Sequence, residues 1–240
     1  KFDKISKDDL TKNIKDKKIL NNVSFDVNFG NICGLLGPNG AGKTSSFYII
    51  AGLTTSDKGQ IKLAGKDVTN LPMHKRSNLG IKYLPQEPSI FQNLTVYENL
   101  FGLAELTFSS KDKIKNFIEE SIEEFNLKDI CDLKGRQLSG GQRRKVEIAR
   151  TLVSDPKMIL LDEPFAGIDP IAIEDIKSVL RKLKSKNIGI LITDHNVRET
   201  LELCDNAAII NSGEIIAHGT KKELIANKEV REVYLGNMYN

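Results

Sequence analysis

A glycine-rich run is the first feature of the sequence that could do chemistry. It fits the pattern G-x-x-x-x-G-K-[ST] and consists of Gly37, Pro38, Asn39, Gly40, Ala41, Gly42, Lys43 and Thr44, followed by Ser45. Such glycines let backbone N–H groups curl around phosphate oxygens, and a following helix N-terminus favours the anion. Lys43 would reach the β- and γ-phosphates, and the Thr44 hydroxyl would bind Mg²⁺. A plain strand-to-helix turn gives no reason for a lysine where the helix dipole disfavours a cation.

Two carboxylates end an apolar run further along the chain. Residues 158–161 are Met-Ile-Leu-Leu, and Asp162 and Glu163 follow directly. Ligands of α/β proteins bind at the carboxyl ends of parallel strands. Asp162 would hold Mg²⁺ through water, and Glu163 would act as general base or polarise the attacking water. An ordinary strand end would be the better explanation if the chain had no phosphate loop.

Two further polar side chains follow short apolar runs. His195 comes after Leu-Ile-Thr-Asp, and Gln86 comes after Tyr-Leu-Pro. Both are expected at carboxyl ends of parallel strands, and therefore near the γ-phosphate. The Gln86 amide can bind Mg²⁺ and sense the γ-phosphate. A structural histidine and an ordinary loop glutamine are the alternatives.

Short apolar runs that alternate with amphipathic segments indicate the elements that must position these residues. Buried strands are expected at 32–36, 159–161 and 188–193, a helix at 44–51, and hairpin arms at 61–63, 207–210 and 215–217. This alternation predicts an α/β fold with a mainly parallel sheet. Residues 89–154 instead have helical periodicity, with Ile114, Phe117, Ile118, Ile122 and Phe125 on one face. We therefore expect a core (1–88 and 155–240) interrupted by a small helical subdomain (89–154).

Composition narrows the function classes. The chain has 240 residues, 28% of them charged, and a net charge of +3. This charge is too small for a typical nucleic-acid binder, so no nucleic-acid partner is expected. The basic start, residues 1–18, is too polar for a secretory signal and is interpreted as a solvated, frayed terminus. No apolar run approaches a membrane span, and three widely spaced cysteines favour a reducing cytoplasm.

A second glycine-rich turn lies within the helical region. Leu138-Ser139-Gly140-Gly141-Gln142 precedes an expected helix at 143–152 and places a hydroxyl and two amides at its N-terminus. One nucleotide cannot use two anion sites that lie in different subdomains of one chain. A head-to-tail homodimer would resolve this, because each ATP would lie between the phosphate loop of one chain and the Ser-Gly-Gly turn of the other.

With these motifs the chain resembles the nucleotide-binding subunits of ABC transporters over nearly its whole length. The order of motifs also fits, with residues 166–169 (Ala-Gly-Ile-Asp) as the D-loop and His195 as the switch histidine. The resemblance implies a single ATPase domain with a RecA-like P-loop NTPase core, an antiparallel β subdomain and an inserted helical subdomain. It also implies ATP and Mg²⁺ as cofactors, a homodimer, and separate membrane subunits. The transport ATPase reading is favoured over a soluble family member in DNA repair or translation.

Residues 161–170 and 192–200 are similar to the branch of the family that powers lipopolysaccharide export. Branched-chain amino-acid importers have a similar tail, at 230–236, and remain the alternative. The resemblance implies a peripheral protein on the cytoplasmic face of the inner membrane. The family's groove for a short helix of each membrane subunit falls near Ile90 and Phe91, although both could instead belong to the helical core.

The sequence departs from the family at the residue that stacks on adenine. An aromatic residue is usual about thirty positions before the phosphate-loop lysine, and Ile14 stands there. Isoleucine offers apolar contact but no ring. Either adenine is held weakly or another group replaces the ring, for which Phe2 is a candidate.

Overall fold

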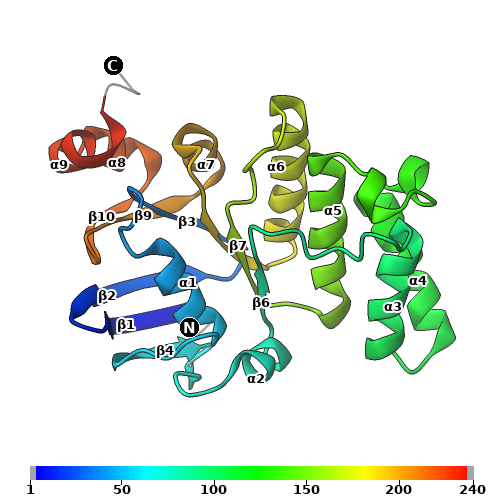
Figure 1. The fold of residues 1–240 in the computed structure, drawn as a ribbon, viewed down its shortest axis with the longest axis horizontal. Coiled ribbons are helices and arrows are strands. Elements are labelled where there is room, and N and C mark those ends of the chain that lie inside the picture. The colour runs from blue at the N-terminus through cyan, green and yellow to red at the C-terminus, as the bar shows by residue number, and fades with distance from the viewer. Residues whose placement is uncertain (1–3, 237–240) are drawn as a thin grey trace.

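A mainly parallel sheet forms the centre of the computed structural model of the chain, which describes residues 4–236 (Figure 1). Its strand order is β10-β9-β3-β8-β7-β6. The strands are β3 (Ile32–Leu36), β6 (Ile81–Leu84), β7 (Met158–Asp162), β8 (Gly189–Thr193), β9 (Asn206–Asn211) and β10 (Glu214–Gly219). Strands β6, β7, β8, β3 and β9 run parallel, and β10 pairs antiparallel with β9 as the hairpin predicted from the sequence.

A second, antiparallel sheet contains the start of the chain. Its order is β2-β1-β4-β5, with β1 (Lys4–Ile14), β2 (Lys17–Asn28), β4 (Lys58–Leu63) and β5 (Lys66–Asp67). The interpretation of the basic start as a frayed terminus was therefore wrong for residues 4–18. Strand β1 pairs with β2 on one side and β4 on the other, so its backbone groups find partners far away in the sequence.

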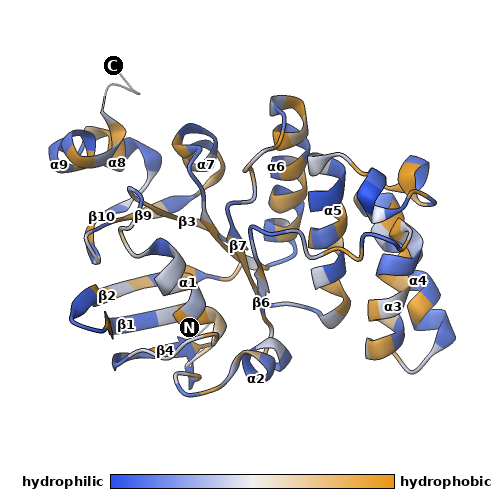
Figure 2. Ribbon diagram, in the orientation of Figure 1, coloured by the Kyte–Doolittle hydropathy of each residue, from blue (hydrophilic) through white to orange (hydrophobic). Residues whose placement is uncertain are grey.

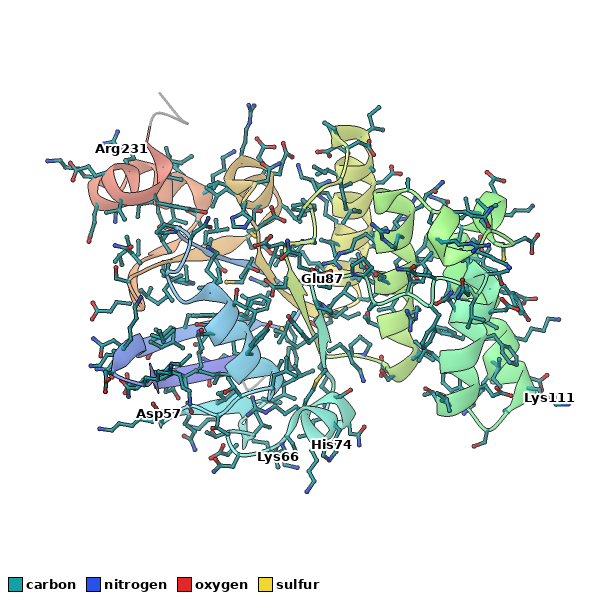
Figure 3. All side chains as sticks on the ribbon, viewed as in Figure 1. Asp57, Lys66, His74, Glu87, Lys111 and Arg231 are labelled. Carbon is teal, nitrogen blue, oxygen red and sulfur yellow. The ribbon has the colours of Figure 1, made fainter. Side chains whose placement is uncertain are left out.

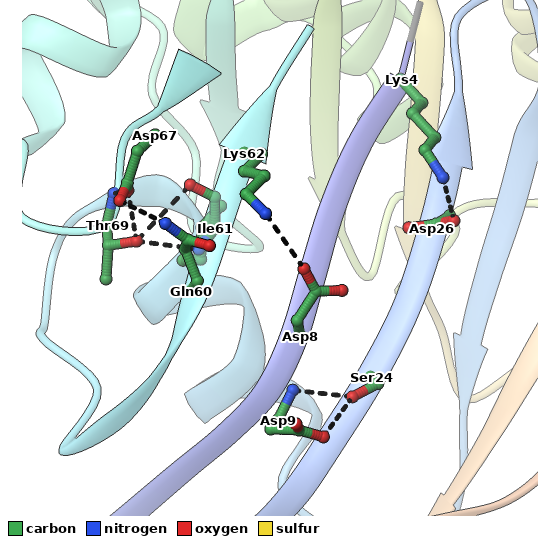
Figure 4. A network of polar contacts seen from close by, with 10 residues as sticks. All are labelled: Lys4, Asp8, Asp9, Ser24, Asp26, Gln60, Ile61, Lys62, Asp67 and Thr69. Carbon is green, nitrogen blue, oxygen red and sulfur yellow. Dashed lines mark hydrogen bonds and ion pairs between the residues drawn. The ribbon is translucent and has the colours of Figure 1, made fainter. Parts of the chain in front are cut away.

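Charged side chains of this sheet are paired across strands rather than simply solvated (Figure 4). Lys4 on β1 contacts Asp26 on β2, and the Lys62 ammonium on β4 lies 3.8 Å from the Asp8 carboxylate. The Asp9 N–H donates to the Ser24 hydroxyl at 2.7 Å. These cross-strand pairs explain why a lysine- and aspartate-rich segment is compatible with a strand.

Lys7 is the exception among these charged residues, because it occupies an inward position of β1. Its side chain is 2% exposed, and the ammonium lies 3.7 Å from the centre of the Phe25 ring. Burial lowers the pKa of Lys7 well below its usual value, although the nearby Cys33 opposes this. Successive side chains of a strand point to opposite faces of the sheet, and the position of Lys7 in β1 therefore buries it despite its charge.

Helices surround the two sheets, and the regular elements between residues 89 and 154 are helical. They are α1 (Lys43–Ala51), α2 (Met73–Asn78), α3 (Val96–Thr107), α4 (Lys111–Glu124), α5 (Gly140–Thr151), α6 (Pro170–Ser185), α7 (Val197–Leu203), α8 (Lys221–Ala226) and α9 (Lys228–Val230), with short turns η1 (Lys128–Ile130), η2 (Gly135–Gln137), η3 (Leu152–Ser154) and η4 (Arg231–Leu235). Lys111 of α4 and Arg231 of η4 lie at opposite ends of the molecule (Figure 3). Among the described residues, no helix is both long and apolar enough to cross a bilayer.

The two faces of the central sheet support different layers. On β7, Met158 and Leu160 pack with α1 and the antiparallel sheet, while Ile159 and Leu161 pack with α5, α6 and the other helices. Both faces are buried, so the strands read as continuous apolar runs, and Figure 2 shows them as hydrophobic. This arrangement brings α1 and α5 to opposite faces of one sheet.

Candidate active site

The phosphate loop joins β3 to α1, and close packing or a positive φ angle accounts for its glycines. A Cβ on Gly37 would lie 2.0 Å from the Ile210 carbonyl oxygen, which no side chain can tolerate. Gly42 has φ +111° and precedes the helix without any side-chain cap. Because no side chain caps α1, the N–H groups of its first turn are free to donate hydrogen bonds to an anion.

Lys43 is the first residue of α1, and its ammonium folds back over the loop. The amine donates to the carbonyl oxygens of Gly37 at 2.6 Å and Pro38 at 3.0 Å, and the residue is 7% exposed. Burial lowers the pKa of Lys43, and the negative charges of Glu163 and Asp162 oppose that shift. The loop thus holds a buried cation next to two carboxylates.

One cavity of about 490 Å³ lies over this loop and is lined mostly by residues that the sequence singled out. Its lining consists of Lys17, Ile19, Asn39, Gly40, Gly42, Lys43, Thr44, Ser45, Glu163 and His195. Lys17 and Ile19 were not expected at the site. They reach it because β2 lies beside the loop, and no local motif marks them.

Glu163 and His195 meet at the edge of this cavity. The His195 Nε2 lies 2.6 Å from Glu163 Oε1. The Glu163 backbone has φ +46°, a strained region for a residue with a side chain, and its N–H donates to the Thr193 carbonyl at 2.8 Å. The hydrogen bond to the neighbouring strand holds the strained backbone of Glu163, and this fixes the carboxylate at the edge of the cavity.

Asp194 ties together the backbone around these two residues. Its buried carboxylate accepts from the N–H groups of Phe165 at 2.9 Å and Asn196 at 2.8 Å. Burial raises the pKa of Asp194, and the two backbone donors oppose the rise. The loops that follow β7 and β8 are therefore linked by one side chain.

Asp162 is oriented by two hydroxyls. Thr193 donates to its Oδ1 at 2.6 Å, and Tyr83 donates to its Oδ2 at 3.2 Å. Burial and the nearby Asp162 charge raise the pKa of Tyr83. A carboxylate has about four acceptor positions, so two remain for a water or an ion. The sequence did not identify Tyr83 and Thr193, because their role depends on neighbouring strands being in register.

Gln86 and the Ser-Gly-Gly turn lie outside the phosphate-loop cavity. Gln86 is exposed and lines a smaller cavity of about 40 Å³ together with Gly140 and Glu163. Among residues 4–236, Glu163 is the one that lines both cavities. Within one chain, the structure therefore places Gln86 and Gly140 near Glu163 but does not bring the second anion turn to the phosphate loop.

The Ser-Gly-Gly turn begins α5 three residues earlier than the sequence predicted. The Ser139 hydroxyl accepts from the Gln142 N–H at 3.2 Å, and the Gln142 side chain accepts from the Ser139 N–H at 2.9 Å. This reciprocal capping box starts the helix at Gly140. A Cβ on Gly141 would lie 2.4 Å from the Ala172 Cβ, so this glycine allows α5 to approach α6.

Ile14 lies at the end of β1 and is 53% exposed. It pairs with Lys17, which lines the phosphate-loop cavity, but Ile14 itself does not line it. Phe2 lies outside the described residues.

Ile90 and Phe91 have opposite environments. Ile90 is 5% exposed and belongs to the hydrophobic core, which is the alternative that the sequence left open for it, rather than to an exposed docking surface. Phe91 is 54% exposed, and the Arg150 guanidinium lies 5.0 Å from its ring centre. A groove of about 570 Å³ lies nearby, and its lining includes Arg150, Ser89, Leu103 and Leu106.

Comparison with known proteins agrees with this geometry. Residues 20–166 match the ABC transporter family. The chain is 50% identical over 236 residues to the lipopolysaccharide export system ATP-binding protein of Haemophilus influenzae, covering 98% of each chain. It is 48% identical to the protein of the same name from Escherichia coli K12, covering 95% of each. The crystal structure of the ADP conformation of MJ1267, an ATP-binding cassette, superposes with a TM-score of 0.86 at 32% identity, covering 97% of this chain and 98% of that one.

Proposed function

Because the chain belongs to the ABC transporter family of ATP-binding proteins, we propose that it is the ATP-hydrolysing subunit of a lipopolysaccharide export system. The observation that carries the ATPase is the cavity in which Lys43, Glu163 and His195 converge. The choice of transported lipid rests on the relatives at 50% and 48% identity, whose matched lengths span nearly the whole chain.

In this proposal, ATP binds with its phosphates over the loop that begins α1. The uncapped helix start and the Lys43 ammonium neutralise phosphate charge. Glu163 accepts a proton from the attacking water or polarises it, and the contact with His195 keeps the carboxylate in place. Exclusion of other solvent depends on closure of the open cavity.

Mg²⁺ would be held by Thr44 and Asp162, whose oxygens are the ligand type that this ion prefers. These two residues fit the ion, because Thr44 lines the phosphate-loop cavity and Asp162 retains free acceptor positions. Gln86 would have to reach them from its separate cavity beside Glu163. When bound, the ion would neutralise charge that develops on the phosphate oxygens. The Thr193 and Tyr83 hydroxyls keep the Asp162 carboxylate oriented for this role.

The second anion turn, Ser139 to Gln142, acts on the nucleotide of a second copy in this proposal. Its separation from the phosphate-loop cavity within one chain supports a head-to-tail homodimer. The exposed Ser139 hydroxyl and the Gly140 N–H would then complete the site from outside.

The membrane subunits would dock at Phe91 and the nearby groove, and the protein would then lie on the cytoplasmic face of the inner membrane. An exposed aromatic ring next to a groove suits a helix-in-groove contact. Ile90 is buried in the hydrophobic core and is not part of this proposed surface.

Glu163→Gln tests the ATPase. The variant should bind ATP, lose steady-state hydrolysis, and accumulate as an ATP-bound dimer, because the product state that separates the chains does not form. Phosphate release and size-exclusion chromatography with ATP measure both effects. Wild-type hydrolysis by this variant would remove Glu163 from the proposed role.

Phe91→Ala tests the docking surface, and co-purification from membranes identifies the partners. The isolated variant should keep its melting temperature and basal ATPase activity, since exposed positions contribute within about 1 kcal/mol, but lose the membrane subunits. Leu53→Ala is a matched control, because Leu53 is 49% exposed on another surface. A destabilised Phe91 variant that still binds its partners would reject the docking surface. If the wild-type chain instead co-purifies with subunits of an amino-acid importer, lipopolysaccharide export is rejected but the ATPase function is not.

A further inference from the structure

The hairpin formed by β1 and β2 extends past the end of its neighbour β4. The ladder between β1 and β4 ends where Thr11 pairs with Lys58. Beyond that point, in the described part of the chain, residues 12–14 pair with β2 alone, and the register of that pairing shifts on both sides of Lys12. A two-stranded hairpin is only marginally stable, and a bulge interrupts its ladder further. Residues 12–17, here called the hairpin tip, therefore gain little order from strand pairing.

The Asp57 carboxylate supports this tip from outside the hairpin. Asp57 directly precedes β4 and is labelled in Figure 3, and its N–H donates to the Thr11 carbonyl at 2.9 Å. Its Oδ2 accepts from the Asn13 N–H at 2.6 Å and from the Asn13 side-chain amide at 3.0 Å, and its Oδ1 lies 3.0 Å from the Lys12 ammonium. One side chain thus takes the place that a longer β4 would have filled.

The hydrogen bonds also settle the charge of this side chain. The Asn13 N–H and the Lys12 ammonium lower the pKa of Asp57, although its residual desolvation opposes the shift. The carboxylate is therefore ionised at neutral pH and can accept all three hydrogen bonds at once.

The other strand of the tip forms one wall of the phosphate-loop cavity. Lys17, which pairs with Ile14, lines this cavity, and so does Ile19 two residues later. Strand β2 also packs against the loop itself, since a Cβ on Gly42 would lie only 2.7 Å from the Leu20 side chain. The position of the tip relative to the loop therefore decides where the Lys17 side chain stands at the cavity.

We infer that Asp57 is a positioning residue for nucleotide binding, which holds the hairpin tip so that Lys17 stays at the phosphate-loop cavity. The inference rests on the proposed ATPase function and adds a residue that sets nucleotide affinity from outside the cavity. Asp57 does not line the cavity, and its effect passes through Asn13 and the strand pairing to Lys17. A lysine on an unsupported tip would have to be ordered each time the ligand binds, which weakens affinity.

Electrostatics alone predicts the opposite effect. Removing a negative charge from the protein cannot weaken its attraction for an anion such as ATP, and here it also frees the Lys12 ammonium from its partner. A loss of affinity after neutralising Asp57 would therefore report the position of the tip rather than the charge.

Asp57→Asn is the test, because it removes the charge and one acceptor oxygen in nearly the same shape. The isolated chain should bind ATP about two- to fivefold more weakly in isothermal titration, with a similar melting temperature, because Asp57 is exposed. KM for ATP should rise by a similar factor while kcat changes little, since the tip contacts neither Glu163 nor the attacking water.

Asp67→Asn is the matched control. Asp67 is another exposed carboxylate of the same sheet, and hydrogen bonds from Thr69 and Gln60 lower its pKa to about 2. It pairs with Lys62, away from the tip, so its replacement makes the same change of charge and should leave ATP affinity unchanged.

A double-mutant cycle with Lys17→Ala tests the route. If Asp57 acts through Lys17, adding Asp57→Asn to Lys17→Ala should cause little further loss of affinity. Fully additive losses would overturn the positioning role, and so would unchanged or tighter ATP binding by Asp57→Asn alone or an equal loss in Asp67→Asn. If the wild-type chain binds ATP without hydrolysing it, the proposed function fails, while these affinities still decide the inference.

Discussion

The chain has two glycine-rich helix starts, and they are built differently. The start of α1 follows Gly42 and has no side-chain cap, with a buried lysine as its first residue. The start of α5 follows Ser139 and is closed by a reciprocal capping box with Gln142. The start of α1 thus leaves its N–H groups open to an anion, whereas the start of α5 already hydrogen-bonds some of its N–H groups to its own side chains.

This difference would suit two ways of binding phosphate. The loop before α1 presents Lys43 and open N–H groups to an anion. The turn before α5 satisfies the Gln142 N–H with its own serine and presents an exposed residue, Ser139, at the protein surface. A self-capped turn of this kind suits a site that is completed only when a second chain arrives.

Replacing Lys43 should have the largest effect on this comparison. Lys43→Ala removes the charge-assisted contact with phosphate and should weaken ATP binding about ten- to a hundredfold. Isothermal titration measures the affinity. Lys17→Ala, at an exposed position of the same cavity, should lose much less. Equal losses in the two variants would mean that overall positive charge, not the loop, binds the nucleotide.

Mixing two inactive variants tests whether the α5 start acts on the other chain. Lys43→Ala and Ser139→Ala damage different halves of the site, so a mixed dimer keeps one intact composite site. Random exchange should restore about a quarter of the wild-type sites. ATPase activity above that of either variant alone would support this arrangement. Affinity-tagged chains verify that mixed dimers form, and mixed dimers without activity would count against action across the dimer.

The capping box predicts a smaller effect on stability. Ser139→Ala should cost about 1 kcal/mol by removing the cap, whereas Ser139→Asp keeps a capping oxygen and should retain stability. Thermal unfolding of both variants measures this. Both should lose ATPase activity, the alanine variant because it lacks the hydroxyl and the aspartate variant because its carboxylate repels phosphate. Full activity of Ser139→Asp would show that this turn meets no phosphate.

The smallest expected effect concerns the adenine end of the α1 site. Ile14→Tyr should tighten ATP binding by about 0.5–1.5 kcal/mol if the ring stacks on adenine. Comparing ATP with GTP for both proteins measures the gain and its selectivity. Ile14→Leu adds no ring and serves as the control. Equal affinities for the tyrosine and leucine variants would place adenine elsewhere.

Local patterns predicted much of the fold and the site. The buried strands β7 and β8 are continuous apolar runs, and each ends at the polar residues that form the cavity edge. The phosphate loop was predicted from its motif, and Glu163 and His195 were each expected near it because parallel strands bring their carboxyl ends to one edge; the structure places both at one cavity. The same reasoning grouped Gln86 with the phosphates, although the structure places it in a separate small cavity beside Glu163.

Other features could not be read from local patterns. Residues 4–14 were expected to be frayed, but β2 and β4 supply their hydrogen bonds from distant parts of the chain. Ile90 and Phe91 are neighbours with the same apolar character, yet one is 5% and the other 54% exposed. Only the packing of α3 and α5 around them decides which one is buried.

The sequence by itself determined the two glycine-rich turns, the acidic strand end and the order of these motifs, because each depends on residue type and short spacing. The tertiary structure decided which groups orient them, because the Tyr83 and Thr193 hydroxyls donate to Asp162 and the Thr193 carbonyl accepts from the Glu163 N–H. The two residues of such a contact are up to 79 positions apart in the sequence. These contacts arise from strand register, which is a property of the whole sheet rather than of any short segment.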